Sequence, residues 1–386
     1  MRQVPRTTKN PRSFDVIVAG SGVAAVASAL SLLKLGRSVA ILERPSPAKG
    51  PVGETLSPRC NQILSELGLL GDFLAQNPLA STSVRVAWNR PHLEEQDYSF
   101  HPCGPWWHVD HAAFRKLLLC AARNSGACLV SSSDIDLVRA NHREWAVEVV
   151  GSDGERRSMR SRVLVDATGR SAFFARKYGA RRERYDNLMA ISGVTHCAAR
   201  ITPDQIFTLI EAVSDGWWYS SFASGHTFVA TFMTDGPLPA VPLKSIWTRQ
   251  LGISQFTRSR LRSPAEAGRV FCLSAATLKT EPLATQALFT VGDAALACDP
   301  LSSQGIQRAL TSGIAAGTAI DDTLRGKVSA AADYARGLEA DFERYLTLRS
   351  SYYSRVSRFR DSTFWNARSE ASDGATKAVC NRNRKS

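Results

Sequence analysis

Between Val18 and Leu33 the chain carries VAGSGVAAVASALSLL, a run without a single charged residue. Extended back to Val16, the run is eighteen residues long, which is enough for a helix that spans a membrane. The same residues also suit a buried strand, a tight turn and a helix. Gly20 and Gly22 separate a valine-rich part from an alanine-rich part, and a spanning helix does not show that division. The run therefore favours the strand, turn and helix.

The turn has the spacing G-x-G-x-x-A, formed by Gly20, Gly22 and Ala25. In this spacing the first glycine permits a tight turn, the second lets a pyrophosphate approach the backbone, and the third position keeps helix and strand close. The N-terminus of the helix offers N–H groups to the phosphates. A second apolar strand, 38–42, ends on Glu43, whose carboxylate can accept hydrogen bonds from ribose hydroxyls. The pattern predicts a dinucleotide-binding unit.

Charge and cysteine content narrow the class of protein further. The net charge is +13, from 48 Lys and Arg against 35 Asp and Glu. Residues 1–12 and 376–386 carry eight basic residues and no acid, which favours solvated tails over nucleic-acid binding and leaves an acidic partner protein as the alternative. The eight cysteines include no C-x-x-C pair, so no metal site is predicted. No apolar leader precedes the first strand, and we expect a cytoplasmic protein outside the membrane.

Three further motifs follow along the chain: GETLSP at 53–58, VLVDATGRSA at 163–172, and GDAALACDPLSSQGI at 292–306. Together with the glycine spacing, and in this order, they resemble FAD-dependent oxidoreductases of the aromatic-hydroxylase type. The resemblance is strongest to the branch that includes the flavin-dependent tryptophan halogenases. It covers residues 14–366 and implies that the cofactor is FAD.

The resemblance also implies roles for single residues. In the family, an aspartate at the position of Asp293 binds the flavin ribityl chain, and a loop like Asp299-Pro300 lies against the isoalloxazine ring. A helix that starts near Ser303 would direct its positive dipole end at the negative charge of reduced flavin. Outside this family context, the same residues would indicate an ordinary turn and a small-residue packing seam. The predicted catalytic residues are Asp299, Pro300 and Trp217. The predicted cofactor-binding residues are Gly20, Gly22, Ala25, Glu43, Arg44, Glu54, Thr55, Arg115, Asp293, Gly305 and Ile306.

Two positions depart from the family pattern. An arginine commonly stands where this chain has His111, and Arg115 follows one helical turn later, so either side chain is a candidate for the cofactor phosphates. The motif DATG at 166–169 differs from the D-G form near flavin and NADPH in many aromatic hydroxylases. Because no second dinucleotide fingerprint occurs, the electron donor is either NAD(P)H that binds transiently or a separate flavin reductase.

These motifs predict an α/β fold with a Rossmann-type FAD-binding domain, an inserted β-rich substrate domain and a C-terminal helical segment. The FAD-binding domain would be discontinuous, because short strand-like runs bounded by Gly, Pro and Asp occur between its motifs. Aromatic and aliphatic residues recur at helical spacing after residue 329. The predicted division is a basic tail 1–13, an FAD-binding domain 14–80, 106–178 and 281–330, a substrate domain 81–105 and 179–280, a helical segment 331–368 and a disordered tail 369–386.

Two aromatic clusters bear on the substrate. Residues 217–219 are Trp-Trp-Tyr, and 106–107 are Trp-Trp. Such residues either line a pocket for an aromatic substrate or fill the core of a sheet. We assign Trp217 to the pocket and the pair at 106–107 to the core.

Two absences argue against halogenation. The halogenases hold hypohalous acid with a lysine after the flavin motif, but no lysine occurs between Lys49 and Lys116. Their W-x-W-x-I-P motif is also missing. Oxygen insertion into an electron-rich aromatic ring needs no catalytic base, only a dry site and a positioned ring.

The sequence therefore predicts an FAD-dependent monooxygenase. It resembles halogenase-like flavoproteins that hydroxylate a tryptophan of a partner protein and so mature tryptophylquinone cofactors of amine and amino-acid oxidases. The alternatives are a halogenase, a reductase that saturates isoprenoid double bonds, and a flavoprotein assembly factor without catalysis.

Overall fold

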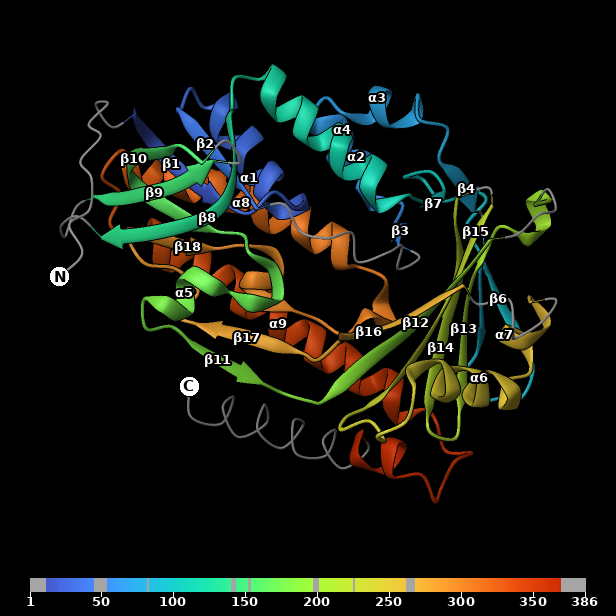
Figure 1. Ribbon diagram of the computed structural model, residues 1–386. Coiled ribbons are helices and arrows are strands. Elements are labelled where there is room, and N and C mark those ends of the chain that lie inside the picture. Colours follow the sequence, from blue (N-terminus) through green and yellow to red (C-terminus); the bar gives the residue numbers. More distant parts are fainter. Residues whose placement is uncertain are drawn as a thin grey trace.

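The computed structural model describes residues 12–44, 54–81, 83–139, 144–151, 154–196, 201–224, 226–261 and 268–368. It contains a largely parallel sheet with helices on it, a second β-rich part and a long C-terminal helix (Figure 1). The predicted α/β fold class is confirmed. Residues 1–11 of the predicted basic tail and the whole predicted tail 369–386 lie outside the described residues.

A six-stranded sheet forms the centre of the first part. β1 lies between β2 and β10 and is parallel to both, β8 starts alongside β2, and β18 lies on the other side of β10. β9 pairs antiparallel with β8 and β10 and so joins the two. The last four residues of β1 are fully buried, which is why this strand is apolar without alternation. The strands are β1 (Arg12–Ala19), β2 (Val39–Glu43), β8 (Cys128–Arg139), β9 (Trp145–Gly151), β10 (Arg156–Asp166) and β18 (Leu288–Thr290).

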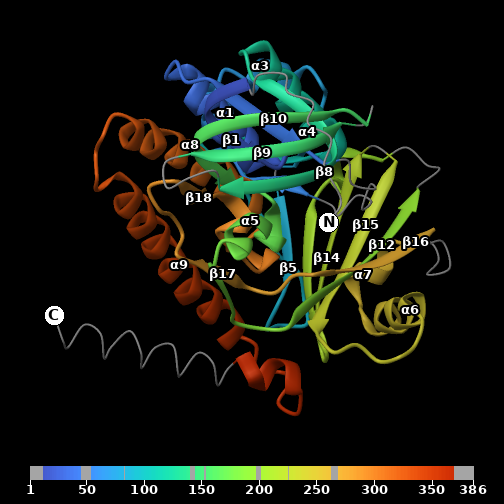
Figure 2. The same cartoon turned by 60° about the vertical axis from the view of Figure 1, so that its left-hand side comes forward.

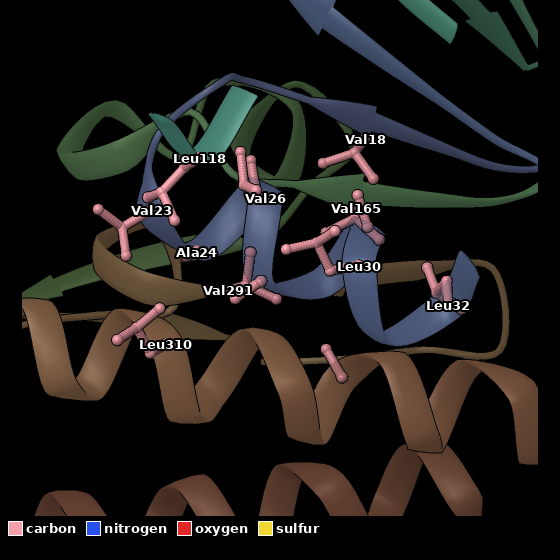
Figure 3. Packing of buried hydrophobic residues seen from close by; sticks show 14 of the residues in the cluster. Val18, Val23, Ala24, Val26, Leu30, Leu32, Leu118, Val165, Val291 and Leu310 are labelled. Atoms are coloured by element: carbon pink, nitrogen blue, oxygen red, sulfur yellow. The ribbon is translucent and has the colours of Figure 1, made fainter. Parts of the chain in front are cut away.

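Helices α1 (Val23–Lys34) and α8 (Gly305–Leu324) pack on each other beside this sheet (Figure 3). Two glycines of α8 permit the close approach. A Cβ on Gly313 would lie 2.6 Å from the carbonyl oxygen of Ala24, and one on Gly317 would lie 2.5 Å from the Ser31 side chain. The other helices of this part are α2 (Arg59–Glu66), α3 (Leu70–Leu74), α4 (His111–Asn124) and α5 (Phe173–Lys177).

A seven-stranded sheet forms the second part, in the order β16-β12-β15-β14-β13-β5-β6. All neighbours are antiparallel except β13 and β5. One face packs on α6 (Leu243–Ile253) and α7 (Phe256–Ser259) (Figure 1). Trp218 of the sheet contacts Trp247 of α6 there. The strands are β5 (Ser83–Ala87), β6 (Glu94–Asp97), β12 (Leu188–His196), β13 (Thr208–Val213), β14 (Gly216–Ser224), β15 (Thr227–Asp235) and β16 (Arg269–Ser274).

Helix α9 (Ala330–Ser354) runs from the first part to the second, and a helical turn follows at residues 363–368 (Figure 2). Tyr353 and Trp365 pack there against the face of the seven-stranded sheet that α6 does not cover. Among the described residues, no helix has the length and apolarity to cross a membrane. The 3-10 turns are η1 (Gly169–Ser171), η2 (Pro203–Gln205), η4 (Gly292–Ala294) and η5 (Pro300–Ser302). Two small sheets join the parts: β3 (Thr55–Leu56), β4 (Leu79–Ser81) and β7 (Trp106–His108), and β11 (Arg181–Arg184), β17 (Leu278–Glu281) and β19 (Leu296–Ala297).

Candidate functional site

A cavity of about 470 Å³ lies where the two parts meet. Segments that follow β1, β10 and β18 form one wall, so the cavity lies at the carboxyl ends of parallel strands, where ligands bind in this class of sheet. The face of the seven-stranded sheet that α6 does not cover forms the opposite wall. The residues of that face that line the cavity are Ala190, Ser192, Tyr219, Thr231, Met233 and Leu273.

The glycine turn after β1 forms an open cradle at the start of α1. Gly20 has a φ of 116°, and a Cβ there would lie 2.3 Å from the carbonyl oxygen of Ala167. Gly22 lines the cavity, and a Cβ on it would meet no atom within 4 Å. The helix has no side-chain cap and no acid in its first turn. Its first N–H groups can therefore bind a phosphate, and the cradle fits the pyrophosphate of a dinucleotide.

Glu43 and Arg115 lie behind this cradle and form an ion pair with each other. Arg115 also donates to the Oγ atom of Ser21 at 2.6 Å and to its carbonyl oxygen at 3.2 Å. Neither side chain lines the cavity. The pair therefore stabilises the turn, and the second carboxylate oxygen of Glu43 remains available to accept hydrogen bonds from a ribose. Arg44 is exposed and Ala25 is buried against the strand.

Glu54, Thr55 and His111 line the rim of the cavity. The Nδ1 atom of His111 lies 2.6 Å from a Glu54 carboxylate oxygen, and this hydrogen bond raises the pKa of His111. The Thr55 hydroxyl lies 3.2 Å from the hydroxyl of Tyr219 on β14. Tyr219 thus connects the rim to the seven-stranded sheet.

Asp293 projects from the turn after β18, where Gly292 adopts a φ of 55°. Its side chain is partly buried and borders the cavity. The surrounding protein raises the pKa of Asp293 by burial, while the nearby Arg170 and Arg182 act in the opposite direction. The Nε atom of Arg170 lies 3.4 Å from the Asp293 carboxylate. The carboxylate is therefore held in place and can accept hydrogen bonds from a ligand.

The carboxylate of Asp299 is fully buried and points toward α9. One oxygen accepts from the Leu301 amide at 2.8 Å, and the other accepts from Tyr353 at 2.6 Å and lies 3.4 Å from Arg349. These contacts fix the loop. Pro300 follows in a 3-10 turn that lines the cavity. Both carboxylate oxygens of Asp299 are occupied by protein partners. We therefore assign Asp299 the role of holding Pro300 in position.

Helix α8 starts directly after this loop and faces the same cavity as α1. Gly305 and Ile306 line the cavity, and a Cβ on Gly305 would meet no atom within 4 Å. The cap residue Gln304 makes no side-chain cap hydrogen bond. The N-termini of α1 and α8, neither with a side-chain cap, thus border the same cavity. This arrangement suits a ligand that carries negative charge at two separate places, one near each helix.

Trp217 does not lie where its assignment to the pocket requires, and we correct that prediction. Its side chain is fully buried and is absent from the cavity wall. Its Nε1 atom donates to the Tyr353 hydroxyl at 3.0 Å, and its ring packs edge-on against Trp88. Trp217 and Tyr219 share one face of β14 and one apolar cluster with the C-terminal segment, but Trp217 is the one that bonds to Tyr353 and Tyr219 is the one that borders the cavity. The cavity residue of this cluster is Tyr219.

The glycine cradle, the Asp293 turn and the second helix N-terminus occur in the order that one sequence family prescribes. The sequence profile of the FAD-binding domain matches residues 13–332. The chain belongs to the FAD-binding domain family. This FAD-binding protein is an oxidoreductase whose relatives include flavin-dependent halogenases, so the resemblance stated from its motifs is confirmed. The family accounts for FAD as the cofactor.

Similar proteins include halogenases and hydroxylases. LodB of Marinomonas mediterranea, named as an FAD-dependent oxidoreductase, is 25% identical over 92% of this chain and 97% of its own length. The myxobacterial chondrochloren halogenase CndH has a TM-score of 0.80 at 21% identity, covering 96% of this chain and 90% of that one. The peptidyl tryptophan dihydroxylase QhpG, essential for tryptophylquinone cofactor biogenesis, has a TM-score of 0.76 at 23% identity, covering 93% and 79%. The two solved structures share the fold of this FAD-binding protein.

The motifs did not identify several side chains of the cavity wall, among them Arg170 and Arg308, and the aromatic cluster at 217–219 did not show which of its members lines the wall. Arg170 comes directly after the DATG motif, so its place after a strand-end turn was a usable signal. Tyr219 was in the aromatic cluster, but strand alternation does not tell which part of a face stays uncovered. Arg308 follows the SSQGI motif on α8, and its position depends on how α8 meets α9.

Proposed function

We propose that the protein is an FAD-dependent monooxygenase that inserts oxygen into an electron-rich aromatic ring. One observation carries the proposal. The side chains of the cavity wall include small, apolar and hydroxyl groups from the seven-stranded sheet and, among the residues that the structure describes, no lysine. A halogenase would need that lysine to hold hypohalous acid. A ring held without water and without a base is what oxygen insertion requires.

The residues of the chain would bind and orient the reactants, since FAD, once reduced, supplies the oxygen chemistry. We assign the phosphates to the N-terminus of α1 at Gly22, the ribose to Glu43, and the ribityl chain to Asp293. The flavin ring would lie between Pro300 and Gly305, where the α8 dipole stabilises negative charge. Tyr219 replaces Trp217 as the side chain that we expect beside the substrate ring.

The remaining predicted cofactor residues take supporting roles in this proposal. Glu54, Thr55 and Ile306, which line the cavity, would contact the flavin once it is bound. Gly20 and Ala25 shape the turn, and Arg115 orients Glu43. Arg44 is left as a candidate for the adenosine end of the cofactor, because it directly follows Glu43 in an exposed position.

We infer further that the ring belongs to a tryptophan of a partner protein. QhpG acts on a peptidyl tryptophan, and this chain shares its fold. The electron donor would be a separate flavin reductase or NAD(P)H. We also retain the division into FAD-binding segments 14–80, 106–178 and 281–330 around substrate segments 81–105 and 179–280.

Mass spectrometry of candidate clients tests the proposal. Reduced holoprotein is mixed aerobically, with chloride and bromide present, with small indoles and with unmatured partner proteins. A client that gains one or two oxygen atoms and no halogen supports the proposal. A halogenated product would establish a halogenase. A client that matures without oxygen uptake, with an unreducible flavin analogue, would establish an assembly factor.

A further inference from the structure

Arg308 of α8 lies in the wall between two cavities. It lines the main cavity, and it also lines a smaller one of about 250 Å³ between α8 and α9. None of the residues assigned to FAD borders the smaller cavity. That cavity is lined by Gln304, Gln307, Arg308, Asp341, Arg344, Tyr345 and Leu348.

Every carboxylate in the wall of the main cavity already has a cationic or hydrogen-bonded partner. Glu54 lies 2.6 Å from the His111 ring nitrogen, and Asp293 and Asp299 each lie 3.4 Å from an arginine Nε atom. Arg170 is one of those partners. Arg308 has no acidic partner within ion-pair distance among the described residues.

The guanidinium of Arg308 is poorly satisfied by the protein itself. Its Nε atom is buried and has no hydrogen-bond partner in the part of the chain that the structure describes. One terminal nitrogen lies 3.3 Å from the Oε1 atom of Gln304, and the guanidinium stands 4.9 Å from the centre of the Tyr345 ring. A partly buried cation without a counter-charge is unfavourable unless a ligand supplies one. By contrast, Arg344 in the smaller cavity is already paired with Asp341.

We propose that Arg308 binds a carboxylate of the substrate, so that the substrate is an aromatic ring with an acidic group close by. The planar guanidinium suits a carboxylate, since it offers two parallel donors. The phosphates of FAD are assigned to the opposite helix, at Gly22, and are not the counter-charge. This inference rests on the proposed function, because it presumes an aromatic substrate in the main cavity.

Binding of matched probes to the FAD-loaded protein tests the inference. Indole-3-acetate and indole-3-acetamide have similar shapes, but only the acetate is charged, so this pair tests a small substrate with a free acid. Blocked Asp-Trp and Asn-Trp dipeptides differ in the same way and test an acidic residue beside a peptidyl tryptophan. We expect the acidic member of at least one pair to bind about tenfold more tightly, the scale of one charge-assisted hydrogen bond. The pair that shows the preference identifies the source of the carboxylate.

Three variants decide whether Arg308 is responsible. Arg308→Gln should abolish the preference for the acid while the neutral probe binds as before. Arg308→Lys should retain part of it, because the charge stays and the planar fork is lost. Arg344→Gln is the matched control, and the preference should survive, since this arginine has its own partner. Retained flavin absorbance and FAD affinity establish that each variant is folded.

Several results would overturn the inference. These are equal binding of acid and neutral probes in both pairs, a preference that persists in Arg308→Gln, and a loss of FAD affinity in place of acid affinity. The proposed function is judged separately by oxygen insertion. If the protein prefers acidic probes but inserts no oxygen, Arg308 still binds anions and the proposed function fails. If the protein inserts oxygen but shows no preference for acidic probes, only the inference about Arg308 fails.

Discussion

The hydroxyl of Tyr353 donates a hydrogen bond of 2.6 Å to the buried carboxylate of Asp299. The same hydroxyl accepts a hydrogen bond of 3.0 Å from the indole nitrogen of Trp217. A single oxygen atom of α9 thus connects β14 of the seven-stranded sheet to the loop before α8. The C-terminal helix is therefore part of the support of the cofactor site, although Tyr353 lies outside the matched FAD-binding domain at 13–332.

Removal of that hydroxyl should weaken both the fold and the site. Tyr353→Phe keeps the ring but leaves the Trp217 N–H without an acceptor and Asp299 with one partner fewer. We expect a loss of about 1–3 kcal/mol in the free energy of unfolding, measured by urea denaturation, together with weaker FAD binding. Tyr352→Phe is the control, because the hydroxyl of Tyr352 makes no such contact. Equal stability of the two variants would contradict the bridging role.

The two glycines of the cradle should respond differently to alanine. Gly20→Ala places a Cβ 2.3 Å from the Ala167 carbonyl oxygen at a φ of 116°, so the fold itself should lose more than about 1–2 kcal/mol of stability. Gly22 has a φ of −80° and open space around its Cβ position. Gly22→Ala should change the stability of the FAD-free protein by less than about 1 kcal/mol. Its FAD affinity should fall by at least about tenfold, because the methyl group takes the place of the phosphates.

Calorimetric unfolding and FAD titration separate the two effects. If Gly22→Ala binds FAD as the unchanged protein does, the phosphates are not at the N-terminus of α1. If Gly20→Ala is as stable as the unchanged protein, the turn after β1 differs from the one described.

His108 should make the stability fall in mild acid. Burial lowers its pKa to about 4, and its Nδ1 atom lies 2.7 Å from the Phe222 carbonyl oxygen. The pKa of His108 in the folded state lies below its value of about 6.5 in the unfolded state. The stability that the neutral, buried ring contributes is therefore fully present above pH 6.5 and is lost as the pH falls toward 4. At 1.36 kcal/mol per pKa unit, the loss is about 3 kcal/mol.

Comparison with His108→Asn isolates this effect, because asparagine can also donate to the Phe222 carbonyl but does not titrate. The difference in unfolding free energy between the two proteins should shrink by about 3 kcal/mol as the pH falls from about 7 to about 4. A constant difference across that range would mean that His108 is not held neutral by burial.

Trp217 and Tyr219 should differ in what their loss affects. Trp217→Phe removes the hydrogen bond to Tyr353 and part of a packed ring, so stability should fall by about 1–3 kcal/mol, while client binding stays unchanged. Tyr219→Phe removes a hydroxyl at the cavity wall, so kcat or KM for the client should change, at a stability cost of about 1 kcal/mol. The opposite assignment, in which Trp217→Phe alone alters KM, would return Trp217 to the pocket.

The dinucleotide unit was predictable because its determinants are local. A strand, a glycine turn and a helix within about twenty residues leave a pattern that the rest of the chain does not alter. Gly20 shows this directly, because its positive φ and its contact with Ala167 exclude any side chain. The motif around Asp293 and Asp299 was found in the same way, through residues adjacent in the chain.

The wall of the cavity was not predictable to the same extent. Period-two alternation places Trp217 and Tyr219 on one face of β14, but whether a residue meets a cavity or another side chain depends on α9. The same holds for Asp299, whose motif position suggests a catalytic group. Its carboxylate instead has partners that stand 50 and 54 residues further along the chain.

The strand–turn–helix cradle and the α/β class were predictable from the amino-acid sequence, because each rests on backbone conformation and residue spacing within short segments. FAD as the cofactor followed from the resemblance of several such motifs to one family. Three further properties became evident only from the folded chain: which aromatic side chain faces the cavity, that Asp299 is anchored by α9, and that Arg308 lies between two cavities without an acidic partner among the described residues. Those properties depend on contacts between segments far apart in the chain, and residue spacing does not encode which of them meet.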